Sequence, residues 1–170
     1  MNHQFWNKAA IYGILLALIT ILFSVLQTVL PSGSKILGFS LWAIRLAGTV
    51  GLLFYVMKDF GKEQDTYLYA NAFKFGLAVS FCSSIIAAAY YYLHVMFLFP
   101  ESSSQMANAM LMGLEQAGVT EADFNIDKLI DRLPVILTLS QFVYFNILGL
   151  LWSSLLANGA KHPTDKTPFN

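Results

Sequence analysis

The sequence predicts an all-α polytopic membrane protein, with four transmembrane helices and an extracytoplasmic helical hairpin between the third and the fourth. Residues 75–100 contain no Asp, Glu, Lys or Arg, and a helix of that length can cross a hydrocarbon layer of about 30 Å. Of the 170 residues, 56% are hydrophobic and only 12% are charged, whereas soluble domains average about 25% charged. A soluble fold of this size could not bury so much apolar surface.

The first span is predicted over about residues 9–30, a run without charged side chains. A cleaved signal peptide is the alternative, because it also starts with a cation and continues with an apolar core. The apolar core here is about 22 residues long, whereas that of a signal peptide has about 7 to 15, and no A-x-A site follows it. We therefore expect this segment to be retained as a membrane anchor.

The second and third spans are predicted over about residues 37–57 and 72–99. Pro31 to Ser34 form a turn before the second span, because Pro and Gly favour chain reversal. Residues 58–74 form a connector with charges of both signs, which ends in several aromatic residues. Such rings favour the headgroup level of a membrane, so we expect the chain to become helical there as it returns to the bilayer.

The segment 102–133 is too polar to cross a membrane, and its pattern predicts two helices outside it. Gly118 is expected to end the first of them, since glycine readily adopts the conformation that closes a helix. The second presents Ile126, Leu129, Ile130 and Leu133 at the spacing of a buried stripe.

Pro134 is expected to open the fourth span, about residues 134–158, because a missing N–H costs nothing in the first turn of a helix. We thus predict one four-helix transmembrane domain over residues 1–160. Residues 161–170 contain two prolines and no apolar period, which indicates a flexible tail.

The distribution of basic residues predicts the orientation. With four spans, six lysines fall on the side of the termini and of the 58–74 connector, against two lysines and one arginine on the other side. Basic residues gather in the cytoplasmic loops of membrane proteins. We therefore expect both termini in the cytoplasm of a bacterial cell and the protein in its inner membrane.

Composition excludes some classes of partner and cofactor. The formal net charge is zero, so the chain has no basic surface for nucleic acid. The single cysteine, Cys82, can form neither an internal disulfide nor a CxxC metal site and reads as a small buried hydrophobe. We expect no cofactor and no bound metal.

Small and polar residues recur at steps of three and four in the predicted spans. Helices associate in lipid through close backbone approach and interhelical hydrogen bonds. The stripes include Gly13 in the first span, Gly76 and Ser80 in the third, and Gly149 and Ser153 in the fourth. These faces should point inward and leave Leu, Ile and Phe to the lipid.

Four polar residues inside the spans are candidates for a functional seam. Arg45 could reach the headgroups or a lipid phosphate, pair with an acidic loop residue, or form a substrate or ion site. His94 could be a proton relay or a metal ligand, or a neutral histidine at the interface. Gln141 and Asn146 could line a polar pore, or bond across helices as packing amides.

Asp123, Asp127 and Asp131 lie four residues apart on one side of the predicted outer helix. This spacing could serve a divalent cation or a basic partner. A solvated helix face is the simpler interpretation. No catalytic site is predicted, because the sequence has no GxSxG elbow, HExxH or glycine-rich phosphate loop.

Several runs resemble the bacterial domain-of-unknown-function 4199 family over nearly the whole chain. They are FWNKAAIYGIL at 5–15, YLYANAFKFGL at 67–77, AAAYYY at 87–92 followed by FPE at 99–101, and LEQAGVTEAD at 114–123. The resemblance implies a four-span bacterial inner-membrane protein with no established activity and no catalytic residues. It also implies a possible partner, a membrane-associated glycosyltransferase. The chain departs from the family pattern at Asn71 and Arg45, so the resemblance gives neither residue a role.

Three functions follow as hypotheses. The first is a non-enzymatic accessory or scaffold protein, which docks a protein partner through the outer helical hairpin or the cytoplasmic connector. The second is a small transporter or channel subunit that uses the polar intramembrane seam and needs a water-filled path. The third, a membrane enzyme, would need two titratable groups brought together in a cavity.

Overall fold

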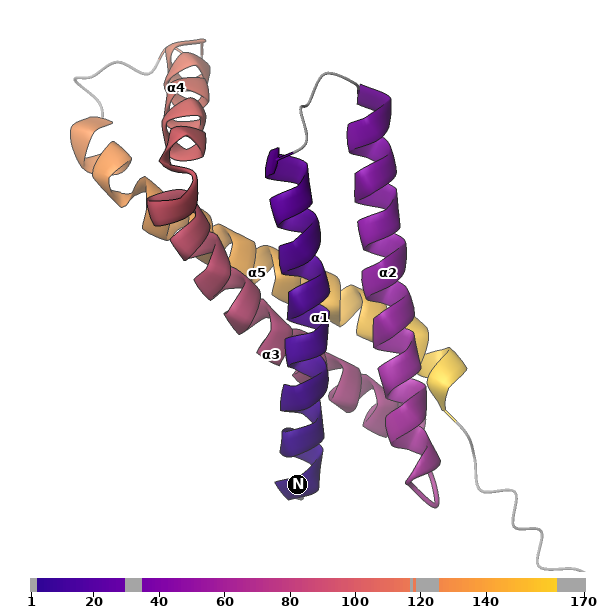
Figure 1. Ribbon diagram of the computed structural model, residues 1–170. Coiled ribbons are helices and arrows are strands. Elements are labelled where there is room, and N and C mark those ends of the chain that lie inside the picture. Colours follow the sequence, from indigo (N-terminus) through magenta and orange to yellow (C-terminus); the bar gives the residue numbers. More distant parts are fainter. Residues whose placement is uncertain (1–2, 30–34, 117, 119–125, 162–170) are drawn as a thin grey trace, which may run out of the picture. The chain divides into compact units, whose positions relative to one another are not determined.

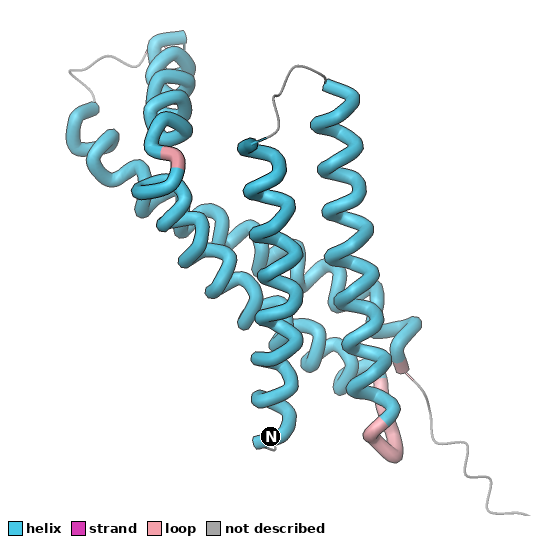
Figure 2. Tube along the Cα trace, in the orientation of Figure 1, coloured by secondary structure: helices cyan, strands magenta, loops and turns pink. Residues whose placement is uncertain are grey.

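The computed structural model describes residues 3–29, 35–116, 118 and 126–161, and these contain helices and no strand. The elements follow in the order α1 (His3–Val29), α2 (Lys35–Lys62), α3 (Tyr69–Leu93), a π-helical turn η1 (His94–Leu98), α4 (Pro100–Gln116) and α5 (Ile126–Ala160) (Figure 1, Figure 2). Four helical segments are long and apolar enough to cross a membrane: His3–Val29, Gly38–Lys62, Tyr69–Leu98 and Asp131–Ala160. The predicted all-α membrane class is confirmed, whereas the side on which the hairpin lies stays a prediction.

The chain divides into two compact units. The first consists of residues 1–87 and 144–170, and the second of residues 88–143. The first unit therefore holds α1, α2, most of α3 and the C-terminal part of α5. The second holds the end of α3, η1, α4 and the start of α5.

In the first unit, α1 and α2 run antiparallel beside each other (Figure 1). Their core is aromatic where α1 begins, α2 ends and α3 begins. Phe60 of α2 stacks on Phe75 of α3 with ring centroids 3.8 Å apart, and Phe5 of α1 meets both rings edge-on. Edge-to-face and offset-stacked pairs are favourable arrangements for aromatic rings. These contacts join the ends of three helices.

Further along the same unit, small residues let helices approach closely. A Cβ added at Gly13 of α1 would come within 2.6 Å of the Cys82 Cβ atom on α3. One added at Gly149 of α5 would come within 2.5 Å of the Ser80 Cβ atom. The small-residue faces predicted for the first, third and fourth spans are thus confirmed as contact faces, and the outward side chains include Leu18, Leu22 and Leu155.

In the second unit, the third span ends in the π-helical turn, where the Phe99 N–H donates to the His94 carbonyl at 2.8 Å. Helix α4 then runs from Pro100 to Gln116. Gly118 follows it with a φ of 75°, a left-handed conformation that favours glycine. The predicted role of Gly118 after this helix is confirmed.

The prediction that Pro134 opens the fourth span is wrong, because Pro134 lies inside the continuous helix α5. A proline inside a helix removes one backbone hydrogen bond and costs about 3 kcal/mol. Neighbouring polar groups can make this tolerable in membrane helices, and no glycine occurs between Ile126 and Gly149 to interrupt the helix. The apolar stripe before the proline and the span after it therefore join as one helix. Residues 162–170, the predicted flexible tail, lie outside the described residues.

Candidate functional site

Arg45, half-buried on α2, contacts an aromatic ring. Its guanidinium carbon lies 5.8 Å from the centroid of the Phe145 ring on α5. Such a contact contributes about 0.5 kcal/mol at exposed sites and about 2 when desolvated. Among the described residues, no carboxylate forms an ion pair with this arginine. Sequence reasoning missed the aromatic partner, since nothing in the sequence pairs positions 45 and 145.

Asn146 joins α5 to α3 through a hydrogen bond. Its Nδ2 donates to the Ser84 Oγ at 2.8 Å, and that hydroxyl donates to the Phe81 carbonyl at 2.8 Å. Ser84 is only 1% exposed. Of the two interpretations of Asn146, this geometry favours the packing amide over the lining of a pore.

His94 and Gln141 belong to the second unit and have aromatic neighbours there. The Tyr90 hydroxyl lies 3.1 Å from the His94 Nδ1 atom, and the Phe99 ring lies 4.8 Å from the imidazole ring, centroid to centroid. Gln141 hydrogen-bonds to the Tyr91 side chain. Within the described ranges, no group of three His, Cys, Asp or Glu side chains could hold a metal ion. His94 is buried among aromatic rings, which favours a structural role over that of a metal ligand.

The aspartate stripe is mostly beyond what the structure describes. Asp123 lies outside the described residues, and Asp127 lies in α5 with its side chain not described. Asp131 is exposed. Whether the three carboxylates share one face stays a prediction.

The first unit contains a cavity that the sequence did not predict. It has a volume of about 330 Å³ and lies between the start of α1, the end of α2 and the start of α3. Its lining residues are Gln4, Phe5, Phe60, Gln64, Tyr67, Asn71 and Lys74. We call it the connector cavity, because Gln64 and Tyr67 belong to the connector 63–68 between α2 and α3.

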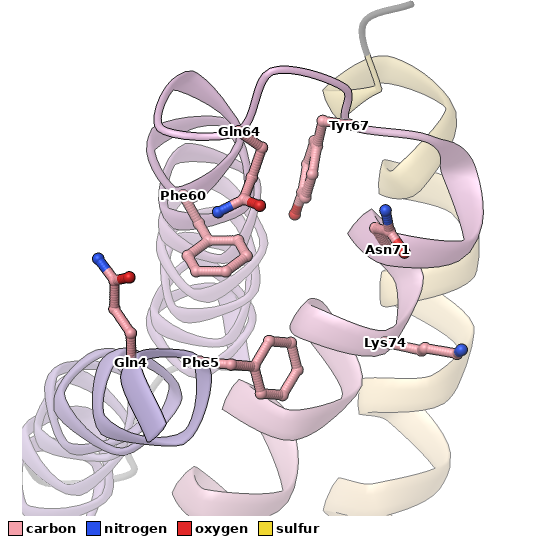
Figure 3. A pocket seen from close by; sticks show the side chains of 7 residues that line it. All are labelled: Gln4, Phe5, Phe60, Gln64, Tyr67, Asn71 and Lys74. Carbon is pink, nitrogen blue, oxygen red and sulfur yellow. The ribbon is translucent and has the colours of Figure 1, made fainter. Parts of the chain in front are cut away.

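Figure 3 shows how the lining is arranged. The Phe5 and Phe60 rings and the Tyr67 hydroxyl point into the space between the helices. Lys74 is an exposed residue at the edge of the lining, and its side chain points away from these rings. The cavity thus combines an aromatic wall with amide groups and one peripheral cation.

Polar contacts from α1 hold the connector in place. Lys8 forms an ion pair with Glu63, and the Tyr12 hydroxyl donates to the Asp59 Oδ2 atom at 2.8 Å. Lys62 pairs with Asp59 at 3.4 Å within α2. Exposed ion pairs contribute less than about 1 kcal/mol each. The Lys8–Glu63 pair holds the start of the connector to α1, and the Tyr12–Asp59 hydrogen bond holds the last turn of α2 to the same helix.

Tyr67 anchors the connector from within. Its side chain is fully buried, and a Cβ added at Gly61 would come within 2.6 Å of its ring. Only a residue without a side chain therefore allows α2 to end beside this ring. Burial raises the pKa of Tyr67 well above its usual range, because a phenolate is poorly solvated there. The phenol remains protonated at physiological pH.

The cavity left no local signal in the sequence. Its amide residues Gln4, Gln64 and Asn71 come from three segments, and amides are common at helix ends for many reasons. The aromatic run Tyr67–Phe75 predicted the membrane level of this region. Only the fold shows that the run, the end of α2 and the start of α1 enclose a space.

A family model described as Protein of unknown function (DUF4199) matches residues 11–158. Neither the curated proteins nor the solved structures compared with the chain give a match. The family match runs from α1 through nearly all of α5 and agrees with the resemblance seen in the sequence. The chain belongs to this family of unknown function, DUF4199.

Proposed function

We propose that the protein is a non-enzymatic accessory or scaffold subunit of the bacterial inner membrane, which docks a protein partner through its cytoplasmic connector. The observation that carries this proposal is the fixed connector. The Lys8–Glu63 ion pair ties it to α1, the Tyr12–Asp59 hydrogen bond ties the adjoining turn of α2 to the same helix, and buried Tyr67 anchors it from within.

A fixed connector favours docking for an entropic reason. Ordering a mobile loop on binding costs free energy that a preorganised loop does not lose. Gln64 and Asp65 are exposed on this connector, so polar groups are offered to a partner in one arrangement. The basic residues near the connector also support the cytoplasmic side for it. The resemblance suggests a membrane-associated glycosyltransferase as a first partner to test.

The transporter or channel hypothesis has weaker support. It needs a water-filled path along the polar seam, but α3 and α5 meet too closely at Ser80 and Gly149 to leave space between them. Asn146, a member of that seam, is engaged with Ser84. We therefore place transport second. We propose no enzymatic activity, since no described cluster supplies two titratable groups facing a substrate.

Site-specific photocrosslinking in cells tests the docking proposal. A photoreactive amino acid at Gln64 should form an adduct with one protein partner, because this exposed side chain lies on the connector. The control is the same probe at Leu22, a lipid-facing position that is 58% exposed. Adducts of equal intensity at both positions, or none at Gln64, would refute docking through the connector.

Charge exchange tests whether the fixed geometry matters. Lys8→Glu or Glu63→Lys alone places like charges together and should reduce the Gln64 adduct. The double exchange restores the ion pair in reverse and should recover the adduct. The two single variants change the net charge in opposite directions, so a reduction in both, followed by recovery in the double variant, would assign the effect to the ion pair and not to net charge. Reduction in all three variants would show that the ion pair is not what matters and would count against the fixed-connector argument.

A further inference from the structure

The connector cavity has a cation at its edge that no described carboxylate neutralises. Nearby, Lys8 pairs with Glu63 and Lys62 pairs with Asp59. Lys74, in contrast, forms no ion pair within the described part of the chain, and no carboxylate is among the cavity's described lining residues. The cavity therefore favours an anion over a cation or a neutral molecule.

The other polar lining groups suit an oxygen-rich anion. Gln4, Gln64 and Asn71 each carry an amide with two N–H donors. A lysine, with neutral N–H donors beside it, can hold a phosphate group through charge-assisted hydrogen bonds. The acceptor oxygens of the same amides can receive hydroxyl groups next to the anion. This combination matches a phosphate ester that also carries hydroxyls.

The apolar wall requires that the ligand also have an apolar part. Phe60 is only 6% exposed, and its ring, with those of Phe5 and Tyr67, forms one side of the space (Figure 3). Of the three rings, only that of Phe5 is partly accessible, because Phe60 and Tyr67 are buried. A glycerol backbone with its first acyl carbons can lie against Phe5 while the phosphate stays near the Lys74 edge.

The cavity lies at the ends of candidate membrane spans, where we expect lipid headgroups. It is formed where one predicted span begins, another ends and a third begins, at His3, Lys62 and Tyr69. Trp6 is next to the lining residue Phe5 and is 47% exposed, and tryptophan favours the membrane interface. A volume of about 330 Å³ is at the small end for ligand sites, so it suits a headgroup and not a whole lipid.

We propose that the connector cavity binds the headgroup of an anionic phospholipid, with the phosphate at Lys74, headgroup hydroxyls at the amides of Gln64 and Asn71, and the glycerol backbone against Phe5 and Phe60. This site does not depend on the docking of a protein partner. It would make the connector end sensitive to the lipid composition of the surrounding leaflet.

Native mass spectrometry of the full chain, released from detergent micelles, tests the proposal. The probes are phosphatidylglycerol and phosphatidylcholine with identical acyl chains, titrated onto delipidated protein. We expect phosphatidylglycerol to bind about tenfold more tightly than phosphatidylcholine. Lys74→Gln should weaken phosphatidylglycerol binding about tenfold, the low end for losing a hydrogen bond to a charged group. Lys74→Arg should retain most of the affinity.

Lys58→Gln is the matched control. Lys58 is exposed near the same end of α2, but its ammonium lies over the Phe54 ring and it does not line the cavity. Its removal should change phosphatidylglycerol binding less than twofold. Asn71→Leu is a second cavity variant, which keeps side-chain size, removes the amide and should weaken binding about threefold. Thermal unfolding of each variant identifies any that is misfolded.

Three results would overturn the proposal. Equal weakening by Lys74→Gln and Lys58→Gln would show only diffuse attraction between basic residues and anionic lipid. Equal affinity for the two lipids would exclude recognition of the headgroup. Displacement of bound lipid by millimolar inorganic phosphate or glycerol phosphate would identify a small soluble phosphate compound, not a lipid, as the ligand of the cavity.

Discussion

Substituting Gly149 by alanine tests the closest contact between α3 and α5. In the wild-type chain, a Cβ at this position would lie 2.5 Å from the Ser80 Cβ atom and 2.9 Å from its Oγ atom. Real carbon atoms do not approach so closely, so the helices must shift. Overpacking of this kind costs typically 1–3 kcal/mol. Alanine favours a helix over glycine by about 1 kcal/mol, and this gain offsets part of the overpacking cost.

Gly48→Ala supplies the reference for that propensity. Gly48 lies in α2, and a Cβ built there meets nothing within 4 Å. This variant should gain the propensity of alanine without any clash. We therefore expect Gly149→Ala to be about 1–3 kcal/mol less stable than Gly48→Ala, measured as the free energy of unfolding in mixed micelles with increasing dodecyl sulfate.

Ser80→Gly should rescue Gly149→Ala. Removing the serine side chain leaves the residue 80 Cα atom as the nearest neighbour, at 3.8 Å from the new Cβ, which is an ordinary van der Waals distance. The Ser80 hydroxyl has no hydrogen-bond partner among the described residues, so its loss leaves no donor or acceptor unpaired. The double-mutant cycle should show a favourable coupling of about 1–2 kcal/mol. Equal stability of Gly149→Ala and Gly48→Ala, or a cycle without coupling, would refute the close contact.

Three further predictions use other parts of the structure. Asn146→Leu should lower the free energy of unfolding by about 0.6 kcal/mol, the average for an interhelical hydrogen bond in a membrane, in the same micelle assay. Burial raises the pKa of Tyr67 in the folded state. The stability that Tyr67 contributes is therefore complete below its unfolded pKa of about 10 and falls as the pH rises above that value. The unfolding midpoint should drop between about pH 9 and pH 11 more for wild type than for Tyr67→Phe. The orientation can be tested in a Cys82→Ser background with a membrane-impermeant thiol reagent. Asp65→Cys should react only in inverted vesicles, whereas Asn108→Cys should react in intact spheroplasts; both residues are exposed. The reverse pattern would invert the proposed orientation.

The sequence was sufficient to predict the class of fold because that class depends on composition. Charge-free runs long enough to span a bilayer can be counted without any structure. The contact faces were also predictable, since Gly13, Gly76 and Gly149 recur with serines at helical spacing and only small residues permit close backbone approach. Which of these stripes meets which other stripe was not predictable, because all of them share the same residue types.

Pro134 shows where local rules failed. A proline preceded by a polar helix and followed by an apolar one satisfies the rule for a helix start. The same residue is also tolerated inside a helix, at a cost that a membrane environment can reduce. Apart from the proline itself, the sequence around Leu133 has no glycine that would end a helix, and this missing second stop signal is the observation that could have indicated a continuous α5.

The candidate site differs from the predicted seam for a physical reason. The seam residues lie within helices that approach through small side chains, and there any polar group soon finds a neighbour, as Asn146 finds Ser84. At the connector end, the side chains between the helices are large rings such as Phe60 and Tyr67, and the connector cavity lies beside them. The cavity is therefore at the ends of three candidate spans, whereas the described seam contact of Asn146 lies within them, and this position is why we propose a lipid headgroup, and not an ion in transit, as its ligand.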